Sequence, residues 1–167
     1  MIVIFLVLWY RLPGFIASVA LLLYISMNLA LFKLIPVTLT STGLAAFILS
    51  IGMAVDANIL IFERMKEERL KGLDLHDAIL EGFKRAWTSI RDGNLSSIIT
   101  AVILFYLATT ALIKGFALVF LIGVLVSMFT ALTASRVLLL AVVPKKKETA
   151  EKPFIKFLFG NGISFKK

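Results

Sequence analysis

The chain has 167 residues, of which 60% are hydrophobic, and its formal net charge is +8. This apolar content exceeds what a soluble core of that size encloses, which favours a membrane protein. Cysteine is absent, which excludes disulfides and thiolate sites, and the single His76 is too little for a histidine metal cluster or Ser-His catalysis. Because a P-loop pattern is also absent, we expect no metal, no cofactor and no enzymatic activity.

The N-terminal segment 1–10 is apolar but too short to cross a bilayer. It has neither a basic leader nor a small-residue cleavage site, so we interpret it as the end of a helix that begins upstream rather than as a signal peptide. Tyr10 to Gly14 follows, where Pro13 and Gly14 break helices and Arg11 marks a membrane edge.

Four later stretches are long enough to cross a hydrocarbon core of about 30 Å, which needs roughly 20 helical residues. The short turns around Lys33 to Pro36 and around Lys114 predict that neighbouring spans are antiparallel. We therefore predict an all-α membrane protein, a polytopic helical bundle with four full transmembrane helices and a partial N-terminal one. The four spans are about 15–32, 39–62, 95–112 and 115–143.

Lysine and arginine are distributed unequally between the two sides of these spans. One side holds only Lys33 and Lys114, whereas the other holds Arg11, Arg136 and all the rest. Since basic residues accumulate in cytoplasmic loops, the second side is predicted to be cytoplasmic. The C-terminus then lies in the cytoplasm.

The cytoplasmic connection 63–93 has a helical pattern of its own. Gly72 is suited to end the helix that leaves the membrane, and Asp74 is a candidate N-cap for the next one. The spacing of apolar residues after Asp74 predicts an amphipathic helix that lies along the membrane surface, with Trp87 at headgroup depth. This helix either only links two spans or docks a partner. Its apolar positions are Leu75, Ile79, Phe83, Ala86, Trp87 and Ile90.

The tail 144–167 begins with three lysines after Pro144 and continues with phenylalanines interleaved with lysines. Such a composition is typical of segments that adhere to anionic headgroups of the lipid bilayer. Docking to an acidic partner is the second interpretation of this basic cytoplasmic tail. We do not expect nucleic acid as a partner.

Asp56 is the one acidic residue well inside a predicted span. A charge there costs several kcal/mol unless it faces protein or water. On a helical wheel, bulky residues such as Leu44 and Ile48 form a lipid-facing arc, whereas small and polar residues that include Gly52, Asp56 and Asn58 occupy the remainder. We therefore expect Asp56 on the packed side of its helix. It either exchanges a proton near neutral pH or is a fixed, hydrogen-bonded strut.

Three further polar residues lie near the cytoplasmic ends of their predicted helices. Asn58 and Asn94 are expected to form hydrogen bonds between helices or to cap them. Arg136 either extends its long side chain to the interface or serves as a counter-ion of Asp56.

The stretch from Gly52 to Arg64, with Val-Asp-Ala-Asn at 55–58, resembles the fourth transmembrane helix of the bacterial SecD family. The related SecF proteins are more distant and lack this run. The resemblance covers roughly Met1 to Val143. Further matching segments are 10–14, 78–79, 81–83, 86–90, 104–106, 114–117, 122–123 and 127–131.

This resemblance implies a protein-export membrane protein of the resistance-nodulation-division superfamily, in the bacterial inner membrane. Members pair with SecF beside the SecYEG channel and use proton flow to help pull secreted preproteins outward late in translocation. Asp56 corresponds to the family's essential fourth-helix aspartate, and Asn58 and Asn94 are expected as its polar neighbours. The family's first helix, periplasmic domain and the start of its second helix are absent from this sequence, so we expect the part that grips substrate to lie outside it.

The run from Arg91 to Asn94 departs from the family pattern, in which an uncharged residue precedes Asp-Ala-Asn. Two rival hypotheses remain beside the proton-coupled subunit. One is a passive scaffold that stabilises SecF or the channel without moving protons. The other is a fragment of an efflux-type transporter of the same superfamily.

Overall fold

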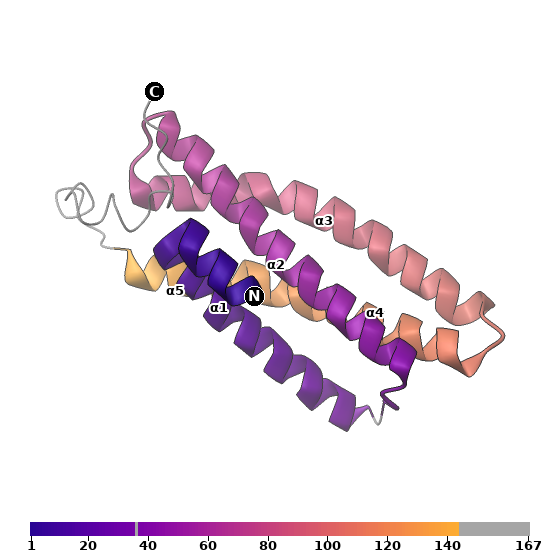
Figure 1. Ribbon diagram of the computed structural model, residues 1–167. Helices are drawn as coiled ribbons and strands as arrows, with labels where there is room; N and C mark the ends of the chain where they lie inside the picture. The colour runs from indigo at the N-terminus through magenta and orange to yellow at the C-terminus, as the bar shows by residue number, and fades with distance from the viewer. Residues whose placement is uncertain (36, 144–167) are drawn as a thin grey trace.

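The computed structural model describes residues 1–35 and 37–143, and this part of the chain is helical, with short connections and no strand. Pro36 and the predicted tail 144–167 lie outside the described residues. Within the described ranges, four helical segments are long and apolar enough to cross a membrane: Val3–Leu34, Ser41–Leu70, Leu75–Leu107 and Ala111–Val142. They lie side by side in a bundle (Figure 1). The predicted all-α membrane fold is confirmed.

Helix α1 (Ile2–Leu34) contains a sharp reversal near its beginning. Arg11 has φ +50° and ψ −113°, which interrupts the helix, and the chain turns back there (Figure 1). A Cβ on Gly14 would collide with the carbonyl group of Leu6, so the close approach of the two arms requires glycine at this position. The predicted break at residues 10–14 is confirmed, although the backbone reverses at Arg11 and Pro13 stays within the helix.

Helices α2 (Ser41–Leu70) and α3 (Leu75–Leu107) form a hairpin. Gly72, with φ +93°, lies in the turn after α2 as predicted. Asp74 occupies the N-cap position of α3, but its side chain makes no capping hydrogen bond. α3 is one continuous helix, so the predicted surface helix and the predicted span 95–112 form a single element that ends at Leu107.

The first half of α3 is amphipathic, as its sequence indicates, but its apolar face packs on protein. Leu75, Ile79, Phe83 and Ile90 are buried in a cluster with residues of α2 and of the last span, so this face covers the core instead of lying on the membrane surface. Neighbouring helices supply this apolar cover, which residue spacing alone does not reveal. Trp87 remains 38% exposed.

The last membrane crossing has three parts: α4 (Ala111–Phe129), the π-helical segment η1 (Thr130–Ala134) and α5 (Ser135–Val142). The turn before it falls at residues 108–110, so Lys114 lies in the first turn of α4 and not in the connection where the sequence placed it. The π-helical segment was not predicted.

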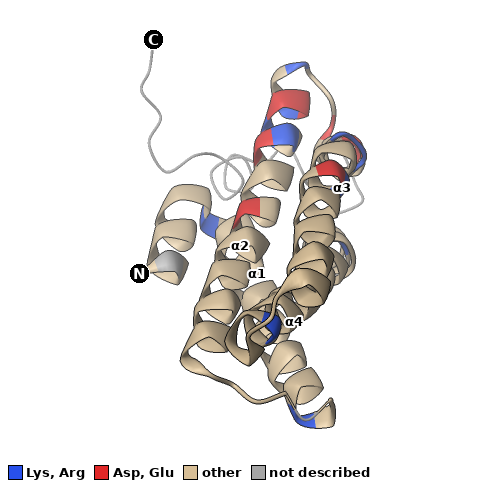
Figure 2. Cartoon of the chain, turned by 90° about the vertical axis from the view of Figure 1, so that its right-hand side faces the viewer, with Lys and Arg blue, Asp and Glu red and all other residues tan. Residues whose placement is uncertain are grey.

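Charged residues gather at one end of the bundle (Figure 2). At this end Arg85 of α3 donates hydrogen bonds to Glu67 (3.1 Å) and to Glu68 of α2. Lys71 donates to Glu68 as well (2.7 Å). Glu68 is only 4% exposed, and these bonds supply its partners. The ion pairs therefore fasten the end of α2 to the start of α3.

Candidate functional site on helix α2

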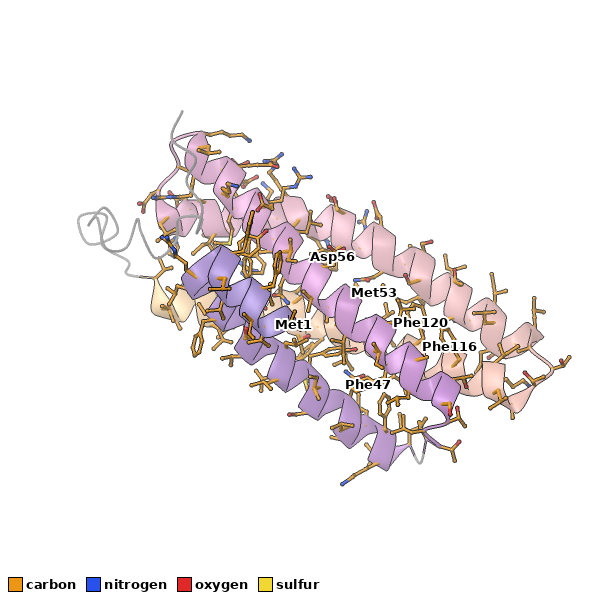
Figure 3. All side chains as sticks on the ribbon, in the orientation of Figure 1. Met1, Phe47, Met53, Asp56, Phe116 and Phe120 are labelled. Atoms are coloured by element: carbon orange, nitrogen blue, oxygen red, sulfur yellow. The ribbon has the colours of Figure 1, made fainter. Side chains whose placement is uncertain are left out.

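Helix α2 carries Asp56 at about its midpoint (Figure 3). The helix is well started, because the side chain of Thr40 accepts a hydrogen bond from the backbone N–H of Gly43 (3.1 Å). It then continues without interruption to Leu70. At 1.5 Å per residue, Asp56 lies about 22 Å from the helix start, well within a bilayer-spanning length.

Asp56 lies on a face of α2 that the rest of the described chain leaves open. We call this the uncovered face; it holds Ala45, Leu49, Gly52 and Asp56, all of which are exposed. A Cβ added at Gly52 would meet no atom within 4 Å. We expected Asp56 on the packed side of its helix, but no other part of the described chain packs against it. Small residues lie on two faces of α2. The sequence pattern does not distinguish the face that this chain covers from the face that it leaves uncovered.

Asn58 lies on the opposite, covered face of α2, where Ser50 and Ala54 are buried too. Its side-chain nitrogen donates to the carbonyl oxygen of Ala54 (2.9 Å), and its side-chain oxygen accepts from the hydroxyl of Ser135 (2.5 Å). The second bond joins α2 to α5. Hydrogen bonding between helices, one of the two roles predicted for Asn58, is confirmed.

The Asn58–Ser135 bond lies next to the π-helical segment. Thr130, its first residue, donates from its hydroxyl to the carbonyl oxygens of Val126 (3.0 Å) and Ser127 (3.2 Å). Because this hydroxyl donates to two carbonyl oxygens, it helps to satisfy backbone acceptors where the helix changes its hydrogen-bond spacing. Sequence reasoning missed this region, although buried Ser127, Thr130 and Ser135 in an apolar span were a usable signal.

A second hydrogen bond between helices lies deeper in the covered face. The hydroxyl of Tyr24 in α1 donates to the hydroxyl of Ser50 in α2 (2.6 Å), which in turn donates to the carbonyl oxygen of Phe47 (2.8 Å). Gly123 of α4 packs so closely that a Cβ there would lie 2.5 Å from the Cβ of Ser50. The covered face is thus both tightly packed and joined to α1 by a hydrogen bond.

The predicted polar neighbours do not assemble around Asp56. Asn58 lies about 200° from it around the helix, Asn94 is buried on α3, and Arg136 is exposed on α5. Among the described residues, no hydrogen bond or ion pair joins Asp56 to any of these three, so the counter-ion interpretation of Arg136 has no support. The same part of the chain contains no group of three or more metal-ligating side chains.

Comparison with known proteins gives this geometry a family context. The profile of the MMPL family matches residues 1–155. The chain belongs to the MMPL family. It is similar to the protein translocase subunit SecD of Thermobaculum terrenum, with 54% identity over 85% of this chain and 28% of the relative. The SecD subunit of Synechocystis sp. is 48% identical over 92% of this chain and 32% of the relative.

Solved structures similar to this MMPL-family chain include SecDF, a translocon-associated membrane protein from Thermus thermophilus. The TM-score is 0.79 and the identity 39%, over 83% of this chain and 19% of that one. SecDF in its super-membrane-facing form gives a TM-score of 0.81 at 38% identity, over 84% of this chain and 19% of that one. The resemblance to SecD that the sequence motif indicated is confirmed, and the chain is a multi-pass membrane protein that spans about a third of the curated relatives' length or less.

Proposed function

We propose that this chain is the membrane portion of a SecD-type accessory subunit of the protein-export translocase, which couples proton flow to late steps of preprotein translocation. The similar SecD subunits and the SecDF structures support this role. The role requires an ionisable group within the membrane, and Asp56 meets that requirement. It requires no catalytic chemistry from the subunit itself.

The observation that carries the proposal is the placement of Asp56 on the uncovered face. A carboxylate facing acyl chains costs several kcal/mol, so in the assembled protein this face needs another membrane helix or a water-filled cleft beside it. Gly52, one turn earlier, leaves open space where a neighbouring helix can approach closely. We assign this cover to SecF, the second component named in the SecDF structures.

In this arrangement Asp56 is a switch at an interface between two membrane bundles. When it binds a proton, the cost of enclosing its charge disappears, which favours tighter packing between α2 and its partner. One charge that crosses 100 mV is worth about 2.3 kcal/mol, enough to shift a two-state packing equilibrium substantially. Cycles of proton binding and release then move α2 relative to that partner.

Helix α2 is well connected to pass such a movement to the rest of the subunit. Asn58 joins it to α5 through Ser135, and Arg85 joins its charged end to α3. The charged end, which also contains the end of α5 (Figure 1), is assigned to the cytoplasm because basic residues concentrate there. SecYEG and secreted preproteins are the further partners that this function requires.

The test is Asp56→Asn in the full-length protein, because asparagine keeps the size and hydrogen bonding of aspartate but does not ionise. Preprotein translocation is measured in membrane vesicles with the proton gradient intact or dissipated by an ionophore. We expect the variant with an intact gradient to translocate no faster than the wild type without one. The matched control is Asp77→Asn, which removes an exposed carboxylate at the charged end of α3 and should leave the gradient dependence unchanged.

The result separates the proton-coupled subunit from a passive scaffold. If Asp56→Asn vesicles keep the full stimulation by the gradient, proton coupling through Asp56 is rejected and only the scaffold role remains. Equal amounts of subunit and partner in all vesicles, checked by immunoblot, ensure that the comparison reports coupling and not abundance.

A further inference from the structure

An open groove of about 570 Å³ lies at the charged end of the bundle, away from Asp56. Residues 80–87 of α3 form one wall, and Leu132 of η1 and Arg136 of α5 form the other. The groove thus connects two elements that lie far apart in the sequence, and one wall includes part of the π-helical segment.

The groove is located where the bundle passes from water into lipid. Exposed residues of α3 are polar or charged from Thr88 to Asp92 and are mainly apolar from Leu95 onward, where Ser96 and Thr100 are the polar exceptions. On the last span the exposed side chains of Phe129 and Leu125 continue the apolar surface from Arg136 toward the middle of the bilayer. A groove with apolar surface on one side and charged surface on the other lies at headgroup depth.

The lining of the groove combines positive charge with apolar and aromatic surface. Lys84 pairs with Glu81 (3.5 Å), whereas Arg136 is exposed and forms no ion pair with any described residue. Two cations against one carboxylate leave the groove net positive. Phe83 and Trp87 supply aromatic surface, and Trp87 is 38% exposed.

We propose that this groove is a binding site for an anionic phospholipid. The guanidinium group of Arg136 is suited to a bidentate contact with a phosphate, and Lys84 adds a second positive charge. The indole of Trp87 has the amphipathic character of residues that occupy the headgroup layer. A phospholipid fits better than a free anion because the apolar wall at Leu132 continues toward the middle of the bilayer into the exposed side chains of Phe129 and Leu125, along which an acyl chain lies.

The experiment measures which lipids contact Trp87 in the full-length protein reconstituted in bilayers. Brominated phosphatidylglycerol or brominated phosphatidylcholine quenches tryptophan fluorescence on contact, and subtraction of the Trp87→Phe signal isolates Trp87. We expect phosphatidylglycerol to be preferred in the wild type. The preference should fall by about fivefold for each cation removed in Lys84→Gln and Arg136→Gln. The control Lys114→Gln, at the opposite end of the bundle, should not change it.

Equal quenching of Trp87 by the two brominated lipids in the wild type would overturn the proposal. Short-chain phosphatidylglycerol should displace the brominated lipid, whereas millimolar inorganic phosphate should not. Displacement by phosphate alone would identify a free-anion site and would also overturn it. Both measurements need only the wild-type protein and the conservative Trp87→Phe variant, so they decide the question even if Lys84→Gln or Arg136→Gln fails to fold.

Discussion

The two faces of helix α2 use polar residues in opposite ways. On the covered face Ser50 and Asn58 have hydrogen-bond partners on α1 and α5. On the uncovered face Gly52 has open space beside it and Asp56 is exposed. The covered face therefore contains what this chain needs to hold itself together, and in the proposed function the uncovered face is the surface that a partner covers.

Solvent explains why the two faces differ. A polar group enclosed in a membrane bundle without a hydrogen-bond partner costs free energy. Polar residues are therefore stable inside the bundle when hydrogen bonds satisfy them. The hydroxyl of Ser135 does so for Asn58. Nothing in the described chain does the same for Asp56, so its presence is not explained by the stability of this bundle. Substitutions on the two faces should consequently affect different measurements.

The largest expected contrast is between two glycine substitutions. Gly123→Ala places a methyl group against the side chain of Ser50 and near the hydroxyl of Tyr24 (3.1 Å), so the covered face must shift. We expect this overpacking to lower the free energy of unfolding of the purified subunit by about 1–3 kcal/mol. Gly52→Ala meets open space, and replacing a helical glycine should leave that stability unchanged or raise it by up to about 1 kcal/mol.

For binding of the partner SecF, we expect Gly52→Ala to have the larger effect and Gly123→Ala the smaller one. Because the added methyl group at position 52 stands where a partner helix approaches, Gly52→Ala should reduce co-purification with SecF, although the subunit itself is stable. Stability is read from unfolding in a denaturing detergent series, and binding from affinity capture of the full-length pair. If Gly52→Ala binds SecF as well as the wild type does, the uncovered face is not the partner interface.

Asn58→Ala should have an intermediate effect on stability. It removes the bond from Ser135 and the link between α2 and α5. Hydrogen bonds between membrane helices average about 0.6 kcal/mol, with a maximum near 1.7, and we expect about 1 kcal/mol here since both groups are buried. Asp56→Ala is the matched change on the uncovered face and should not alter the unfolding midpoint of the isolated subunit. Equal losses from both would refute the distinction between the faces.

Tyr24→Phe should produce the smallest change, because it removes one hydroxyl and keeps the ring. The bond to Ser50 is lost, but Ser50 retains its bond to the carbonyl oxygen of Phe47. We expect a loss of about 0.6 kcal/mol in the same detergent series. Tyr106→Phe, at a tyrosine that is 77% exposed, is the control and should be neutral.

Some of these features were predictable because they depend on local chemistry. The break near Arg11 and the end of α2 near Gly72 follow from residues that disfavour a continuing helix. The continuity of α3 through Gly93 was not predictable in this way, since burial of Ile90 and Asn94 on either side favours the helix at that position. The π-helical segment was missed because hydropathy does not encode hydrogen-bond spacing, although the polar residues Ser127, Thr130 and Ser135 marked this part of the apolar span.

By itself, the sequence determined that the protein is a membrane protein and roughly which segments cross the bilayer, and it placed Asp56 inside one of those segments. These conclusions rest on hydropathy summed along each segment. That sum depends only on neighbouring residues and not on how the helices pack. Only the tertiary structure decided that Asn58 binds Ser135, 77 positions away, and that Asp56 faces outward from the described chain. Such facts depend on which helices pack against which face, and the periodicity of a single helix does not contain that information.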